Sequence, residues 1–175
     1  MSSIRVLAVA VFVAALFVAS PVAAQQPANP LDVVPPAMPF DVPYGAPVTL
    51  ERAQAAINAA VAEAAKHNWK LNVAVYDSGA NLVAFQRMDG AQLASIKVSE
   101  HKARVAVIYR RETKVFEGGI QSGFNYLITL DDVIASRGGI PLVVGGKLIG
   151  AIGCSGGTGS QDEVACKAGA AVINK

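Results

Sequence analysis

The chain has 175 residues, of which 53% are hydrophobic and 16% charged, and its formal net charge is +2. This length suits one domain with a sizeable core, and the apolar content excludes an intrinsically disordered chain. So small a charge excess argues against a nucleic-acid-binding surface, which would need clustered positive charge. Two cysteines are too few for a disulfide-rich mini-scaffold or a four-cysteine zinc site.

The first 24 residues have the pattern of a secretory signal peptide. One basic residue, Arg5, precedes an apolar run over residues 6–19, and small residues lead up to Ala24. The run is shorter than the roughly 20 apolar residues that cross a bilayer, so an uncleaved membrane anchor is the less favoured alternative. We expect cleavage after residue 24 and a periplasmic or secreted protein without a membrane segment.

A proline-rich arm follows over residues 25–47 and contains seven of the nine prolines. Proline fixes φ and lacks the N–H that ladders need, so this stretch should be extended and polyproline-like. Two interpretations stay open. The arm is a tether between membrane and domain, or it is a contact surface for a partner, because it also carries apolar side chains.

The domain proper is expected over residues 48–175, and it begins with a helix and a hairpin. Thr49 can cap a helix whose apolar positions recur at helical spacing and which fades at His67. Two runs rich in β-formers, residues 71–77 and 82–88, flank a turn-forming segment. They predict an antiparallel hairpin.

The middle of the domain is predicted to be helical and then irregular. A second helix fits residues 92–109, and a short third helix should start at Thr113 and break at Gly118 and Gly119. Residues 121–137 show no regular period, although their apolar side chains must cover something apolar.

The C-terminal part repeats the hairpin-then-helix order. Residues 140–144 and 147–154 flank a Gly-Gly turn, and Ser160 with Glu163 is expected to form the capping box of a final helix. Strands joined by tight turns make an antiparallel sheet that helices must cover. The fold class is therefore α+β and not a Rossmann fold.

Two strings carry a family resemblance: VAVYDSGANLVAFQRMDGAQLASIKVSEHKARVAVIYRRETKVFE and GGIPLVVGGKLIGAIGCSGGTGSQDEVACKAG. Over residues 49–175 the chain resembles the GlcG/HbpS-like family, whose relatives include the C-terminal domain of PduO-type cobalamin adenosyltransferases. The resemblance implies a profilin-like fold, with a five-stranded antiparallel sheet covered by helices on both faces, and a homo-oligomer. It also implies binding of haem, with haem b the expected form.

The resemblance points to one residue in particular. The RRETK segment matches the family's stretch after the second helix, where a threonine hydroxyl is thought to touch the iron, and Thr113 occupies that position. The alternative is a plain helix N-cap, which is where threonine is often found.

Other candidate residues follow from haem chemistry. The iron is held by His, Met, Cys or Tyr, and the propionates favour Arg or Lys. His101 is the candidate metal ligand, and its neighbours Lys97, Lys102 and Arg104 are candidates for the propionates. The alternative is a solvated charged helix face. For His67, at a helix C-terminus, a favourable interaction with the helix dipole is the simpler interpretation.

Cys154 and Cys166 lie 12 residues apart, on a predicted strand and the helix that follows it. A disulfide between them would stabilise the fold by roughly 3 kcal/mol in the chain-entropy model. Two buried free thiols are the other interpretation. The glycine-rich loop between them could cradle an anion, but Asp162 and Glu163 would repel one, which favours a tight connection.

No catalytic group stands out. The sequence shows neither a convincing catalytic triad nor a histidine pair at metal-binding spacing. We therefore expect an exported haem-binding protein for scavenging, buffering or sensing, in which a sensor protein is one conceivable partner. Two alternatives remain open: a haem-degrading enzyme, and a non-catalytic interaction module of a periplasmic oxidation system.

Overall fold

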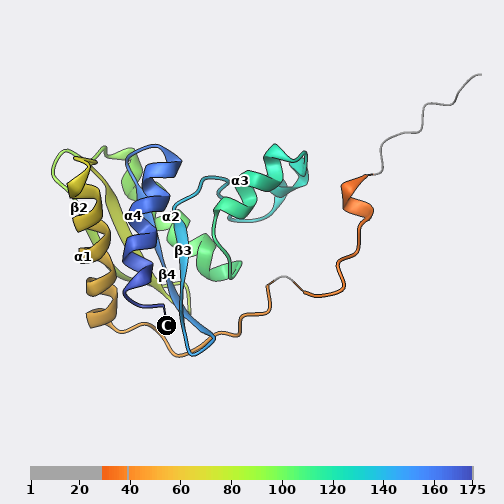
Figure 1. Cartoon of the computed structure of the whole chain (residues 1–175), viewed down its shortest axis with the longest axis horizontal. Coiled ribbons are helices and arrows are strands. Elements are labelled where there is room, and N and C mark those ends of the chain that lie inside the picture. The colour runs from red at the N-terminus through yellow and green to blue at the C-terminus, as the bar shows by residue number, and fades with distance from the viewer. Residues whose placement is uncertain (1–28, 39, 175) are drawn as a thin grey trace, which may run out of the picture. The chain divides into compact units, whose positions relative to one another are not determined.

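A computed structural model describes residues 29–38 and 40–174 (Figure 1). The predicted signal peptide, residues 1–24, lies outside the described residues. Within the described ranges, no helix is both long enough and apolar enough to span a membrane.

The chain divides into two compact units, Met1–Val34 and Pro35–Lys175. In the first unit, the described part forms a single 3-10 turn, η1 (Pro30–Asp32). The side chain of Asn29 caps it by accepting a hydrogen bond from the N–H of Leu31 at 3.0 Å. The second unit holds all the remaining elements.

The sheet of the second unit has four strands, all antiparallel, in the order β2-β1-β4-β3. The strands are β1 (Asn72–Asp77), β2 (Leu82–Arg87), β3 (Gly139–Val144) and β4 (Lys147–Ser155). Both predicted hairpins are confirmed, because β1 pairs with β2 and β3 pairs with β4. The two hairpins join through β1 and β4 in the middle of the sheet.

Helices cover both faces of this sheet. They are α1 (Leu50–Lys66), α2 (Ala94–Ile108), α3 (Lys114–Gln121) and α4 (Gly159–Ala171), and a 3-10 helix, η2 (Asn125–Thr129), follows α3. Helices α1 and α4 lie side by side over one face, and α2 lies on the other (Figure 1). The predicted α+β class is confirmed.

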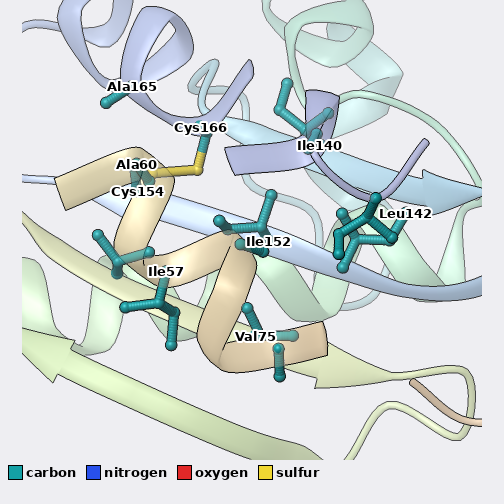
Figure 2. Packing of buried hydrophobic residues seen from close by; sticks show 14 of the residues in the cluster. Ile57, Ala60, Val75, Ile140, Leu142, Ile152, Cys154, Ala165 and Cys166 are labelled. Carbon is teal, nitrogen blue, oxygen red and sulfur yellow. A yellow bond between two sulfur atoms is a disulfide. The ribbon is translucent and has the colours of Figure 1, made fainter. Parts of the chain in front are cut away.

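The face under α1 and α4 holds the main apolar core (Figure 2). Ile57 of α1, Val75 of β1 and Ile152 of β4 are fully buried there. The two helices approach closely because small residues line their contact. A Cβ added to Gly169 of α4 would lie 2.6 Å from the carbonyl oxygen of Ala56 on α1.

A disulfide closes this core. Cys154 on β4 and Cys166 on α4 are bonded, with their Cα atoms 5.6 Å apart, inside the range that a bridge requires. Both residues are fully buried, and Figure 2 shows the bond between the strand and the helix. Of the two interpretations left open by the sequence, the structure has the bridge.

The apolar cluster on the opposite face of the sheet is smaller, and α2 lies directly on that face. A Cβ on Gly153 of β4 would fall 2.1 Å from the carbonyl oxygen of Ser99, so only glycine allows this contact. Ala106 of α2 packs with Leu148 and Ala151 of β4 in a second, smaller apolar cluster. The backbones of α2 and β4 are therefore held in a fixed relation.

The predicted fifth strand was wrong: the described residues form four strands. Where a further strand could pair with the start of β4, residues 43–48 make only an isolated parallel bridge. Leu148 donates its N–H to the Pro43 carbonyl at 2.8 Å and accepts from the Gly45 N–H at 2.7 Å. Pro43 and Pro47 lack the N–H groups that a regular ladder needs.

The end of the predicted proline-rich arm packs on its own domain. The Tyr44 hydroxyl donates to the last carbonyls of α2, those of Val107 and Ile108, at 3.2 and 3.1 Å. Arg110 donates from Nη1 to the Val42 carbonyl at 3.1 Å, and its guanidinium also lies near the Tyr44 ring. We call residues 40–48 the strap, because these contacts fasten it across the end of α2.

Helix α3 does not break at its glycines, contrary to the sequence prediction. It runs through Gly118 and Gly119 and ends near Gly123, which has a positive φ of 90°. A glycine inside a helix costs only about 1 kcal/mol. Position 119 requires glycine, because a Cβ there would lie 2.4 Å from a methyl carbon of Leu127.

The cap of α4 also differs from the prediction. Thr158 and Gln161 form the capping box, not Ser160 and Glu163. The Thr158 N–H donates to Oε1 of Gln161 at 2.8 Å, and the Gln161 N–H donates to the Thr158 hydroxyl at 3.4 Å. Glu163 is not free to cap because its carboxylate binds three cationic side chains.

Candidate functional site

Thr113 is fully buried at the start of α3. Its hydroxyl donates to the Ser136 carbonyl at 2.7 Å and accepts from the Gly139 N–H at 2.9 Å. Thr113 occupies the N-cap position of α3, as the alternative interpretation expected, but its backbone is already helical and its side chain makes no capping hydrogen bond. The hydroxyl ties α3 to the start of β3, with both of its hydrogen-bonding roles satisfied inside the protein.

His101 and Arg104 are brought together on α2, as their spacing predicted, and they share one partner. Nε2 of His101 lies 3.0 Å from both the carbonyl oxygen and Oδ1 of Asp132, and Nε of Arg104 donates to Oδ2 of the same residue. Asp132 has a positive φ of 59°, a conformation that Asp tolerates better than most residues. The pair therefore anchors the loop that follows η2.

The two lysines near His101 have separate roles. Lys97 is 85% exposed and pairs with Glu100 at 2.7 Å. The hydrogen bond to Glu100 raises the pKa of Lys97 above its usual value. Lys102 is 1% exposed and donates to Oδ2 of Asp162 on α4 at 2.8 Å. The expectation that Lys102 could meet a propionate was therefore wrong.

His67 lies at the end of α1, away from these residues. Its Nε2 is 3.2 Å from Oε1 of Glu63, and its ring stacks on Trp69 with centroids 4.4 Å apart. Hydrogen bonds from Lys66 and His67 lower the pKa of Glu63. This group is a surface cluster at a helix C-terminus.

The glycine loop after β4 is filled by the protein's own acid. Oδ1 of Asp162 accepts from the Gly157 N–H at 3.0 Å, so the anion of this cradle is Asp162. The preferred interpretation, a tight connection, agrees with this contact. In the described part of the chain, no group of three His, Cys, Asp or Glu side chains could hold a metal ion.

A cavity of about 330 Å³ lies between α3, η2 and the strap. Six residues form most of its wall: Phe40, Arg111, Phe116, Phe124, Tyr126 and Leu127. We call it the α3–η2 cavity. Sequence reasoning missed it, although the apolar but irregular stretch after residue 121 was the signal that could have indicated it.

Among the described residues of the cavity wall, Arg111 is the one that carries a positive charge. Its guanidinium stacks over the Phe40 ring and lies 5.4 Å from the centroid of Phe116. Burial lowers the pKa of Arg111 below its usual value. Among the described residues it makes no ion pair with a carboxylate; its Nε donates to the Tyr109 carbonyl at 2.9 Å.

The loop that carries the cavity's aromatic residues is held to α2 at two successive positions. The Tyr109 hydroxyl donates to the Asp131 carbonyl at 2.6 Å, one residue before the Asp132 contacts of His101 and Arg104. His101 and Arg104, the predicted site residues of α2, thus hold the loop that follows the cavity wall.

A charge network fixes α3 against α4. The carboxylate of Glu163 accepts hydrogen bonds from Lys167 at 2.6 Å, Lys114 at 3.1 Å and Arg137 at 3.3 Å. Arg137 also pairs with Glu117 of α3 at 2.6 Å. Because both acids share Arg137, the position of α3, and with it one wall of the α3–η2 cavity, depends on α4.

A second depression, of about 390 Å³, lies where α1 begins and α4 ends. Its wall includes Glu51 and Arg52, beside aliphatic residues such as Val144 and Val172. It contains none of the residue types that bind haem iron. The α3–η2 cavity is the better candidate because it joins aromatic surface to an unpaired cation.

The model of a known family, described as "Haem degrading protein HbpS-like", matches residues 48–171. The chain belongs to the HbpS-like family. It is 42% identical over 105 residues to the protein GlcG of Escherichia coli K12, which covers 60% of this chain and 78% of GlcG. The resemblance read from the sequence is confirmed.

Solved structures of HbpS-like relatives share the fold. The crystal structure of HbpS has a TM-score of 0.69 and 31% identity, over 79% of this chain and 99% of HbpS. The crystal structure of a PduOC–haem complex has a TM-score of 0.66 and 26% identity, over 73% of this chain and 96% of PduOC.

Proposed function

We propose that this protein binds haem in the α3–η2 cavity. The observation that carries the proposal is Arg111, a half-buried cation without an acidic partner among the described residues, in a wall that is otherwise aromatic and apolar. A flat apolar ligand with carboxylates complements such a wall, since guanidinium groups bind carboxylates well. Membership of the HbpS-like family and the haem complex of PduOC support the same ligand.

The residues present fit a haem. Phe124 and Tyr126 offer ring faces or edges to a porphyrin, with the buried Phe116 behind them, and Arg111 offers its guanidinium to a propionate. When bound, haem would supply an iron centre able to take up small ligands or electrons. The protein's own part is to exclude water with aromatic side chains and to neutralise one propionate.

Size and exposure support a homo-oligomer. A volume of about 330 Å³ is near the lower end of the range for small-molecule sites, so part of a porphyrin would extend beyond the cavity. The neighbouring side chains of Val115, Tyr126 and Ile128 are 48%, 49% and 71% exposed. In our proposal a second copy of the chain covers them and the outer part of the haem.

The cysteines support both export and the haem type. Both sulfurs are used in the Cys154–Cys166 disulfide, a bond that persists in oxidising compartments such as the periplasm or the extracellular space. No free thiol remains to attach haem covalently, which favours haem b. Our proposal therefore includes a periplasmic or secreted location, a homo-oligomer and haem b. It also includes a profilin-like classification of the fold and a role in scavenging, buffering or sensing.

The test is a titration of the purified protein with ferric haem. We expect a saturable shift of the Soret band, with at most one haem per chain. Phe124→Ala should weaken binding by about tenfold or more, because a buried aromatic contact is lost. Leu82→Ala, at an exposed apolar residue of β2, is the matched control and should bind like the parent. No Soret shift at micromolar protein would refute haem binding.

Haem degradation is the second candidate function, and the description of the family model favours it. Addition of ascorbate to the haem-loaded protein separates the two. Loss of the Soret band with release of iron, faster than for free haem, would establish degradation. A stable Soret band would leave binding as the function.

A further inference from the structure

Few side chains of this protein are of a type that can bind haem iron. Haem iron takes His, Met, Cys or Tyr as protein ligands. In the described residues both cysteines are in the disulfide, and Nε2 of His101 is engaged by Asp132. Met88 Sδ accepts from the Leu71 N–H inside the domain. None of these side chains lines the α3–η2 cavity, and neither does His67 or the exposed Met38.

The four tyrosines differ in what their hydroxyls do. Those of Tyr44 and Tyr109 donate to backbone carbonyls, and burial raises the pKa of Tyr76. Tyr126 alone lines the α3–η2 cavity, and its hydroxyl makes no hydrogen bond to any described residue. Its side chain therefore combines a free ligand atom with a place in the cavity wall.

The surroundings of Tyr126 hold it in place. The Thr129 hydroxyl donates to its carbonyl at 2.6 Å, and its ring meets that of Phe124 edge-on, with centroids 6.4 Å apart. Arg111 lines the same cavity. Tyrosine binds ferric iron through its phenolate oxygen.

We infer that Tyr126 would hold the iron of a ferric haem bound in the α3–η2 cavity. The inference rests on the proposed function and names the iron-binding side chain of the same site. The phenol would give up its proton to solvent on binding, and no electron would be transferred. His101, the ligand expected from the sequence, becomes a positioning residue that holds the loop through Asp132.

The experiment compares ferric-haem complexes of the parent, Tyr126→Phe, Tyr76→Phe and His101→Ala by absorption and resonance Raman spectroscopy. The parent should show tyrosinate vibrations enhanced by a charge-transfer band from phenolate to iron. Tyr126→Phe should lose them and bind haem at least tenfold more weakly. Tyr76→Phe removes a phenol that does not line the cavity and should keep both the vibrations and the affinity. His101→Ala should keep the vibrations but bind haem more weakly, because the loop loses one of its contacts with α2.

The possible results separate the two claims. If the parent binds haem and Tyr126→Phe leaves its spectrum unchanged, Tyr126 is not the ligand while haem binding stands. If only His101→Ala changes the coordination spectrum, the iron is bound by His101 and the inference is wrong. If the parent binds no haem, the proposed function fails first and the inference fails with it.

Discussion

The two sides of the sheet are built from different kinds of residue. Under α1 and α4 the core consists of small and branched apolar side chains closed by a disulfide, and its glycine and alanine contacts leave no space (Figure 2). After α2, the segment formed by α3 and η2 leaves Tyr126 about half exposed and Ile128 mostly exposed, and it forms much of the wall of a cavity. The first region stabilises the fold, and the second contains the cavity in which we propose that haem binds.

The α3–η2 segment is held in place without an apolar core of its own. The α3–η2 segment is held by polar ties: Thr113 to β3, Asp132 to α2, and Glu117 through Arg137 to α4. Because polar contacts hold this segment, its apolar side chains are not all needed for packing, and some of them remain exposed. Disturbing the first region should therefore cost stability, whereas disturbing the second should change ligand binding.

The largest expected effect comes from the buried pair of Lys102 and Asp162, which joins α2 to α4. Lys102→Met leaves the Asp162 carboxylate buried without its cation, and we expect a loss of about 3–5 kcal/mol in the free energy of unfolding. Urea denaturation measures it. The double variant Lys102→Met/Asp162→Asn should recover part of the loss, because the amide oxygen still accepts from Gly157. A loss below about 1 kcal/mol for the single variant would mean the pair is structurally unimportant.

The disulfide gives the next effect. Replacing both Cys154 and Cys166 by Ala should lower the free energy of unfolding by roughly 3 kcal/mol, since a short loop is no longer closed in the unfolded chain. Haem affinity of the folded variant should stay within about twofold of the parent, because neither cysteine lines the α3–η2 cavity. A selective loss of haem binding at full stability would contradict the division into two regions.

The smallest effect is a dependence on pH. Hydrogen bonds from Arg137 hold the pKa of Glu117 below its ordinary value of 4.5. A carboxyl whose pKa is lowered by folding stabilises the protein above that ordinary value, and the contribution is lost as the pH falls through the folded-state pKa. We expect a contribution on the order of 1 kcal/mol or less, measured by urea denaturation between neutral and acid pH. Glu117→Gln should flatten this part of the profile; an unchanged profile would assign the acid loss to other groups.

Much of the fold could be predicted from local sequence, because its signals are local. The two hairpins follow from turn residues between β-rich runs, and α1 from the Thr49 cap and its spaced alanines. The absence of a fifth strand and the capping box of α4 were not predicted. The prolines of the strap prevent a regular ladder. Glu163 is held by Lys167 four residues away and by Arg137 and Lys114, which lie 26 and 49 residues distant in sequence.

The candidate site was harder to predict for the same reason. His101, Arg104 and Asp132 meet only because the loop folds back on α2 over about thirty residues, and the sequence indicates the first two but not their partner. Thr113 carries no local sign that its hydroxyl is buried. The α3–η2 cavity needs Phe40, Arg111 and Tyr126 from three separate segments, and no spacing rule connects them.

Crystals of the haem-loaded protein would test the central claim most directly, through the anomalous scattering of iron. We predict a single iron peak in the α3–η2 cavity, at bonding distance from the Tyr126 hydroxyl, with Arg111 beside a propionate. An iron peak next to His101, or one away from this cavity altogether, would contradict it.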